Sequence, residues 1–418
     1  MLKNLFHQAD IPAEYRSNFI HLYFDMGWFG VLSGSAVNFL NVYAARLGAT
    51  GLQIGLLAAV SAVMNLIFAM PAGRWLEQRP IGKAVFWTSV FYRLGFALWI
   101  PLPWLFGNEG QIWALILIAL YMGIPLTALA VGFNALFAEA VPINYRAQVA
   151  GTRNILLSVT FMLTSIISGY LLDHLAFPMG YQVVFAIGFF GAAMSSVHLF
   201  FVRPLNKEAT PPPSTPQLAT VNKNPSIPRP WQAALRLDIW QTEYRNHLLV
   251  LLGFHLSQYL AIPLFSIFLV DHLHLSDDTI GLGTAFFYLA MLIGSMRLRQ
   301  IVNRIGHKTL TGWGVAGMAL YPIVIAFSTQ AWHYYVASLI GGFVWAMVGG
   351  AYANYLLEHT PINDRPSHLA WYNVVLNAAI LFGSLAGPAI ANVTGIVVAL
   401  FVFGILRILA GMAILKWG

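Results

Sequence analysis

Ionisable side chains inside apolar runs are the residues of this chain whose types best suit chemistry. Asp25 interrupts an apolar run at residues 22–28, and His255 interrupts another. A carboxylate removed from water takes up a proton more readily, and an imidazole titrates near neutral pH. Both groups could therefore exchange protons under physiological conditions. The alternatives are a helix–helix hydrogen bond for Asp25 and a satisfied polar contact for His255.

Two arginines also lie in apolar surroundings. Arg93 follows Lys83 by ten residues, which places it about 15 Å along a helix. At that depth its guanidinium group needs a carboxylate or a cavity. Arg407 lies in the middle of the last apolar run, where packing or snorkelling is as reasonable as a functional role.

Aromatic and amide side chains around these groups form a second set of binding candidates. They lie near Asp25 and His255 or at matching positions of the two halves of the chain, and they are Trp28, Phe29, Asn38, Asn41, Gln258, Tyr259 and Asn377. Small polar groups also join transmembrane helices to one another, so helix packing is the alternative for each amide.

The composition decides which elements position these residues. Of the 418 residues, 58% are hydrophobic and only 9% are charged, and the mean hydropathy is +0.69. A soluble domain carries about a quarter charged residues, so soluble enzymes and disordered chains are excluded. The chain has no cysteine, which excludes disulfides and thiolate metal sites.

The apolar runs are long and do not alternate, so they predict transmembrane helices rather than barrel strands. Twelve are predicted, at residues 19–44, 52–72, 84–106, 112–138, 148–172, 180–202, 247–270, 279–298, 309–328, 333–357, 368–391 and 396–415. The expected fold is all-α and polytopic, with one six-helix bundle in residues 1–202 and another in residues 247–418. Residues 203–246 are a proline-rich linker, and residues 231–245 within it predict an amphipathic helix in the plane of the membrane interface.

The basic residues predict the orientation. Nineteen of the 22 lysines and arginines fall in the N-terminus, the even-to-odd loops, the linker or the C-terminal end, or in the helix ends next to these segments, and the opposite loops contain only Arg46. Positive charge concentrates on the cytoplasmic side, so both termini are expected there, in a cell membrane. Topology thus explains the net charge of +7, and the expected partner is a lipid bilayer rather than nucleic acid.

The two halves of the chain resemble each other. Residues 139–154 and 358–373 align without a gap at an offset of 219, with six identities in sixteen positions. Residues 50–55 similarly resemble residues 276–281, at the start of the second and eighth predicted helices. Two related six-helix halves are an architecture of secondary transporters.

Two loops carry a further resemblance. Residues 73–83 read G-R-W-L-E-Q-R-P-I-G-K and residues 303–308 read N-R-I-G-H-K. Both resemble the G-x-x-x-D-R-x-G-R-K signature of the major facilitator superfamily, with Glu or Asn in place of Asp. The resemblance covers the whole chain and implies a central site between the bundles. It also implies a gate of cytoplasmic ion pairs, for which the candidates are Glu77, Arg79, Glu139, Arg146, Arg304, Glu358 and Arg365; solvated loop charges are the alternative.

The function expected from these features is secondary transport of a small solute by alternating access, coupled to protons through Asp25 and His255. An exporter of amphipathic or cationic compounds suits one carboxylate among aromatic residues. A sugar, polyol or lipid-like solute, or a receptor built on the same fold, is the alternative. No nucleophile–base constellation suggests an enzyme, and the protein is expected to be a monomer.

No cofactor is expected beyond a proton or another coupling ion. Asp271, His272 and His274, with Asp277 and Asp278, resemble a metal cluster, but their spacing is weak, and a solvated polar loop is expected instead.

Overall fold

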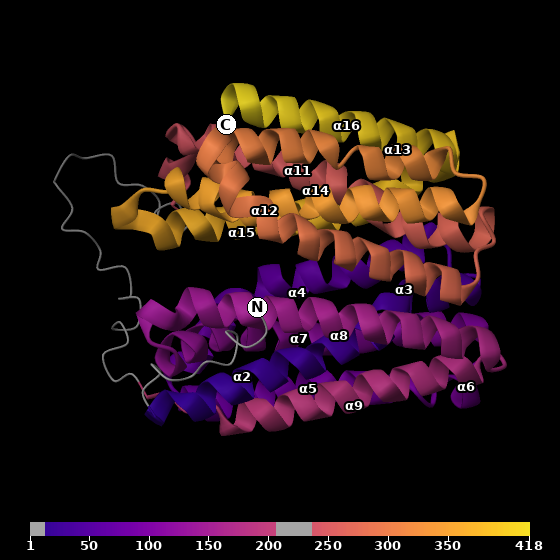
Figure 1. Ribbon diagram of the computed structural model, residues 1–418, viewed down its shortest axis with the longest axis horizontal. Helices are drawn as coiled ribbons and strands as arrows, with labels where there is room; N and C mark the ends of the chain where they lie inside the picture. Colours follow the sequence, from indigo (N-terminus) through magenta and orange to yellow (C-terminus); the bar gives the residue numbers. More distant parts are fainter. Residues whose placement is uncertain (1–12, 206–235) are drawn as a thin grey trace.

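The computed structural model describes residues 13–205 and 236–418, and within these ranges the protein forms helices but no strands. The helices lie side by side in two bundles, one from each half of the chain (Figure 1). The first bundle contains α2 (Ala13–Leu32), η1 (Ser33–Val37), α3 (Asn38–Arg46), α4 (Gly51–Glu77), α5 (Ile81–Trp99), α6 (Leu102–Leu105), α7 (Asn108–Ala140), η2 (Ile143–Tyr145), α8 (Arg146–His174) and α9 (Met179–Phe201).

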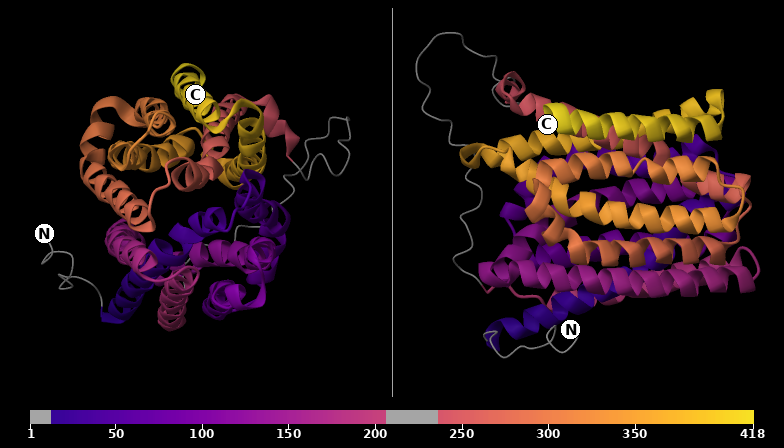
Figure 2. Two further views of the ribbon diagram at one scale, coloured as in Figure 1. Left: turned by 90° about the vertical axis from the view of Figure 1, so that its right-hand side faces the viewer. Right: turned by 45° about the horizontal axis from the view of Figure 1, so that its top comes forward.

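The second bundle contains η3 (Leu237–Gln241), α11 (Tyr244–Ile267), η4 (Phe268–His272), α12 (Asp277–Gly317), α13 (Leu320–Ala326), α14 (Ala331–Glu358), η5 (Ile362–Asp364), α15 (Arg365–Thr394) and α16 (Ile396–Trp417). We call the side on which α2 begins and α16 ends the terminal side, and the opposite side the distal side. Both bundles run along this direction (Figure 2).

The prediction of twelve transmembrane helices in two bundles is confirmed. Within the described ranges, nine helical segments are long and apolar enough to cross a membrane. One of them, Asp277–Ala326, is 50 residues long and contains a break at Gly306, where φ is +79°, so it crosses twice. The two remaining crossings are Ala13–Arg46, which packs on α8 and α9, and Ile81–Trp99, which packs on α7 and α9.

The repeated sequence folds the same way in both halves. Pro142 and Pro361 each precede a single 3-10 turn, η2 in the first bundle and η5 in the second. A second correspondence appears in the first and seventh crossings, which each contain a π-helical turn, η1 and η4. The sequence repeat therefore reflects the pseudo-symmetry of the two bundles.

The predicted interface helix at residues 231–245 is wrong where the structure describes it. Residues 231–235 lie outside the described ranges, and the following segment forms one 3-10 turn, η3. Arg236 begins this turn in the left-handed region, with φ of +50°, and Thr242 ends it in an extended conformation. Arg236 also donates to Asp238 and Asp364, and Ile239, which is 1% exposed, lies in a hydrophobic core of the second bundle, so the segment packs on that bundle through ion pairs and an apolar side chain.

Among the described residues, the bundles share a hydrophobic core on the distal side and not on the terminal side. One hydrophobic cluster includes Phe39 and Ile54 from the first bundle and Phe268 and Ile280 from the second. Toward the terminal side each bundle has a core of its own. One of these cores contains Phe19, Leu22 and Leu136, and the other contains Leu248, Val348 and Tyr355.

Two glycines allow the distal helices to approach closely. A Cβ atom on Gly55 of α4 would collide with the backbone carbonyl of Ser384 in α15. A Cβ atom on Gly281 of α12 would likewise collide with the carbonyl of Ser165 in α8. The two halves are therefore packed backbone to backbone on the distal side.

Candidate functional site

A buried ion cluster lies in the first bundle around Asp25. The Asp25 carboxylate accepts a hydrogen bond of 3.2 Å from Nη2 of Arg153 and lies 3.6 Å from Nη2 of Arg93. Ser195 Oγ donates to the same carboxylate at 2.5 Å. Relative exposure is 3% for Asp25, 4% for Arg93 and 9% for Arg153. Four helices, α2, α5, α8 and α9, thus contribute one polar group each.

Each arginine is held by further contacts. Arg93 Nη1 donates to Ser196 Oγ at 2.8 Å, and Ser196 is also 3.0 Å from Ser89. Arg153 lies over the rings of Phe133 and Phe137, with its Cζ 4.5 Å and 5.5 Å from their centroids. Of the carboxylate or cavity expected for Arg93, the structure shows a carboxylate, that of Asp25.

The charges of this cluster do not balance. Two guanidinium groups share one carboxylate, which leaves one excess positive charge in a buried position. The Nε atoms of Arg93 and Arg153 have no hydrogen-bond partner among the described residues. Buried charged groups left without partners are costly, so the excess charge of this cluster is unfavourable for the fold.

A histidine pair lies beside the cluster. The Nδ1 atoms of His21 in α2 and His198 in α9 are 3.0 Å apart. One of the two nitrogens must donate and the other accept. His198 stacks on Phe24, with ring centroids 5.1 Å apart, which fixes the pair one helical turn from Asp25.

The second bundle contains a separate set of buried polar groups. His255 is 5% exposed, and its Nε2 lies 3.1 Å from the hydroxyl of Tyr372. Arg407 is 3% exposed and donates to the backbone carbonyls of Ser257, Gln258 and Met318. No carboxylate of the described residues pairs with Arg407. Asp25 and His255 therefore lie in different bundles, each with partners of its own.

The remaining binding candidates are dispersed. Trp28 packs edge-on against Phe190 and lines an apolar groove between α2 and α8. Asn38 donates to Ser165 at 3.1 Å, and Asn377 donates to a carbonyl of its own helix. The others, which are half-buried, are Phe29, Asn41, Gln258 and Tyr259.

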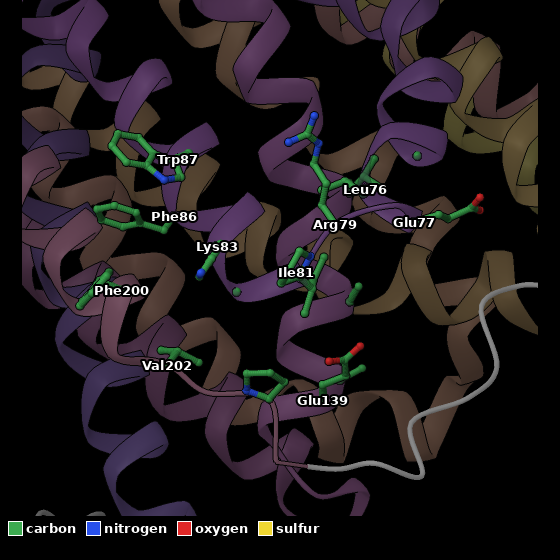
Figure 3. A pocket seen from close by; sticks show the side chains of 17 residues that line it. Leu76, Glu77, Arg79, Ile81, Lys83, Phe86, Trp87, Glu139, Phe200 and Val202 are labelled. Atoms are coloured by element: carbon green, nitrogen blue, oxygen red, sulfur yellow. The ribbon is translucent and has the colours of Figure 1, made fainter.

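Three of the gate candidates line one cavity within the first bundle. Glu77, Arg79 and Glu139 surround a cavity of about 1160 Å³ on the terminal side, together with Lys83 and Trp87 (Figure 3). Figure 3 shows Glu77 and Arg79 pointing away from each other. The guanidinium group of Arg79 instead lies 4.7 Å from the ring of Trp75.

The other gate candidates make local contacts. Arg146 donates to the carbonyls of Ala138 and Val141 and so caps the end of α7. Glu358 lies 3.7 Å from His307 of its own bundle. Arg304 and Arg365 are exposed. The gate role stays a prediction, because this structure has separate cores on the terminal side, where such pairs would close.

An ion pair that the sequence did not suggest joins the bundles on the distal side. Arg46 Nη2 donates to Asp277 Oδ1 at 3.0 Å, and Tyr181 donates to the other oxygen at 2.8 Å. The backbone N–H of Asp277 donates to Asp173. The expected solvated loop is thus wrong for Asp277, which is 6% exposed, because three groups of the first bundle surround it. We call Arg46, Asp173, Tyr181 and Asp277 the distal lock.

Arg153 is the other functional candidate that the sequence did not single out. It counts among the basic residues of the terminal side, yet it lies seven residues into α8. This depth of about 10 Å along the helix could have identified Arg153 as a buried charge from the sequence. The sequence could not have identified its partner Asp25, which is 128 positions away in the chain.

Comparison with known proteins places the chain among membrane transporters. The sequence model described as "Major Facilitator Superfamily" matches residues 24–254 and 248–417. The cis,cis-muconate transport protein of Acinetobacter baylyi is 24% identical over 269 residues, which are 62% of each chain. Multidrug resistance protein 2 of Bacillus subtilis is 26% identical over 133 residues, 32% of this chain and 33% of that protein. Each match thus spans less than two thirds of the relative.

Solved structures share the fold at low sequence identity. The D-xylose-proton symporter aligns with a TM-score of 0.70 and 17% identity, covering 97% of this chain and 98% of that one. The nucleoside transporter NupG aligns with a TM-score of 0.66 and 12% identity, covering 96% and 98%.

Proposed function

Because the chain belongs to the major facilitator superfamily, we propose that it is a secondary transporter that moves a small organic anion across a cell membrane by alternating access. The chain is a multi-pass membrane protein with the fold of a transporter, and it is not an enzyme. We propose in addition that the substrate is anionic, that protons are the coupling ion and that the terminal side faces the cytoplasm.

The arrangement of the cores supports alternating access. The bundles share a core and the distal lock on one side, and they have separate cores on the other. A transporter closed on the distal side and open on the terminal side would have this distribution of contacts. The opposite state requires the distal lock to break and the terminal ends to close.

The observation that carries the substrate class is the balance of buried charge. Arg93, Arg153 and Arg407 are buried in the membrane-spanning helices, where Asp25 is the acid that pairs with two of them. The excess positive charge favours an anionic ligand, since an unpaired charge in low dielectric attracts a counter-charge strongly.

The preference for a cationic substrate rested on Asp25, and its two arginine partners remove the basis for that preference. A cation would have to displace two guanidinium groups from one carboxylate. The similarity to a protein named for the transport of cis,cis-muconate, an organic anion, supports the anionic class.

Protons are the proposed coupling ion. Asp25 lies beside the His21–His198 pair, and His255 contacts Tyr372, so each bundle contains titratable side chains within its membrane-spanning helices. The terminal side is proposed to face the cytoplasm, because the lysines and arginines concentrate there.

Transport by the purified protein tests the proposal. Liposomes containing a pH-sensitive dye would receive separate pools of organic acids (with cis,cis-muconate among them), sugars and cationic drugs, with and without a pH gradient. We expect a proton flux with organic acids that empty liposomes lack. Flux with sugars or cations but not with acids would contradict the anionic class, and ligand binding without flux would favour a receptor.

A further inference from the structure

The two unpartnered donors of the Asp25 cluster have the chemistry of a ligand-binding site. Buried polar groups are normally hydrogen-bonded, yet the Nε atoms of Arg93 and Arg153 have no partner among the described residues. Both side chains are at least nine-tenths buried. Two cations with unused donors and one excess positive charge have the chemistry that a carboxylate group satisfies, since guanidinium binds carboxylates through paired N–H donors.

Arg153 is the more accessible of the two arginines. Its side chain is 10% exposed, compared with 5% for Arg93. It lies against Phe133 and Phe137 of α7, which are both half-buried, and the next residue in α8, Asn154, is exposed. An anion would therefore meet Arg153 first.

We propose that Arg153 and Arg93 form a binding site for the carboxylate group of the transported anion, and that Asp25 competes with this anion for the same guanidinium groups. The inference rests on the proposed function and deepens it, because it names the residues that bind the substrate. It also gives Asp25 a defined role.

The competition links the anion to a proton. Each guanidinium group can pair with Asp25 or with the ligand, so an ionised Asp25 weakens anion binding. A proton on the Asp25 carboxylate removes its charge and releases Arg153, and bound anion in turn favours that proton. This reciprocity is required by thermodynamic linkage, and it moves proton and anion in the same direction.

Several other groups face the cluster and set its charge. His198 and His21 lie on the α9 and α2 sides, Ser195 donates to Asp25, and Tyr92 lies next to Arg93 in α5. The histidines are titratable groups as well. A variant that changes Asp25 alone therefore separates the contribution of Asp25 to the pH dependence of binding from that of the histidines.

Binding to the detergent-solubilised protein tests the site without transport. Calorimetry would measure cis,cis-muconate binding across a range of pH, with the uncharged dimethyl ester as the ligand control. In the wild type we expect affinity to fall as the pH rises. In Asp25→Asn we expect affinity at neutral pH to rise about tenfold or more, the factor carried by one hydrogen bond to a charged group, and to depend less on pH.

Two substitutions of Arg153 test whether its positive charge is required for binding. Arg153→Gln should weaken muconate binding about tenfold or more, and Arg153→Lys should restore part of it because the charge returns. Lys83→Gln, which also removes one positive charge but lies at the start of α5 outside the cluster, should bind like the wild type. Thermal melting of each variant verifies that it is folded.

The outcomes separate this inference from the proposed function. Unchanged muconate affinity in folded Asp25→Asn or Arg153→Gln, or equal binding of the dimethyl ester, would overturn the site. If organic acids were transported nevertheless, the proposed function would stand without it. If muconate bound as expected but no organic acid produced flux, the site would stand and the transport proposal would fail.

Discussion

The distal lock should control the balance between the two access states, and its energetic weight follows from its contacts. Asp277 accepts from Arg46 at 3.0 Å and from Tyr181 at 2.8 Å. The side chain of Arg46 is 26% exposed and that of Asp277 is 9% exposed, so the pair is only partly screened by water. A hydrogen bond to a charged group contributes about 1.5–3 kcal/mol.

Replacing Asp277 by Asn should therefore destabilise the distal-closed state by about 1.5–3 kcal/mol, which changes the population ratio by about tenfold to about 150-fold. Tyr181→Phe removes one donor and leaves the ion pair, so its effect should be smaller. Arg46→Gln combined with Asp277→Asn should cost less than the sum of the single changes, because both remove the same interaction.

The absence of cysteine from the chain makes the assay direct. Glu109→Cys and Gln330→Cys would place spin labels at exposed distal positions of the two bundles. Double electron–electron resonance should give a single short distance in the parent protein and an added longer distance in Asp277→Asn. An unchanged distance distribution in Asp277→Asn, with the protein folded, would refute the lock as a determinant of the access state.

Three further predictions follow from other parts of the structure. Gly55→Ala should populate the distal-open distance in the same assay because its Cβ would meet the Ser384 carbonyl, whereas Gly73→Ala in the same helix, with open space around it, should not. Ser195→Ala should lower the free energy of unfolding by about 1.5–3 kcal/mol because Asp25 loses a donor, and Ser295→Ala, which loses one bond to a carbonyl of its own helix, should change the melting temperature less. Hydrogen bonds from Arg236 hold the pKa of Asp238 below its usual value. Burial raises the pKa of Asp364, but hydrogen bonds from Ser367 and Arg236 outweigh this effect and hold that pKa below its usual value as well. The resulting stabilisation is present at neutral pH and is lost as the pH falls through these lowered pKa values. At pH 7, Arg236→Gln should therefore lower the free energy of unfolding by about 0–1 kcal/mol, the contribution of an exposed ion pair, and its melting temperature should converge with that of the wild type in acid. Arg245→Gln, the control, should not show this pH-dependent difference.

The sequence predicted the bundle architecture because hydropathy and the repeat are local properties. Apolar runs of transmembrane length identify helices without knowledge of their neighbours, and the offset of 219 between residues 139–154 and 358–373 relates the halves directly. The repeat even extends to matched 3-10 turns after Pro142 and Pro361. Local signals were therefore sufficient for fold class.

Partners in the candidate site could not be predicted in the same way. Asp25 and Arg153 are 128 positions apart, and Arg46 and Asp277 are 231 positions apart, in different bundles. Charge counting assigns Arg153 to the terminal side and Asp277 to a loop, because it records positions along the chain and not depth or packing. The gate residues illustrate the same limit, since Arg146 caps a helix that it follows in sequence instead of pairing across the bundles.

Asp25 has a double role that follows from the charge balance of its cluster. Two buried arginines without any carboxylate would each carry a large desolvation penalty, so Asp25 stabilises the bundle through the same contacts that oppose an anionic ligand. A ligand carboxylate that replaces it must make equivalent contacts, or the bundle loses stability when substrate binds. The Nε atoms of Arg93 and Arg153, which have no partner among the described residues, are additional donors for that ligand carboxylate. Stability and substrate binding therefore depend on the same guanidinium groups, and a protonated Asp25 leaves the anion as their only negative partner.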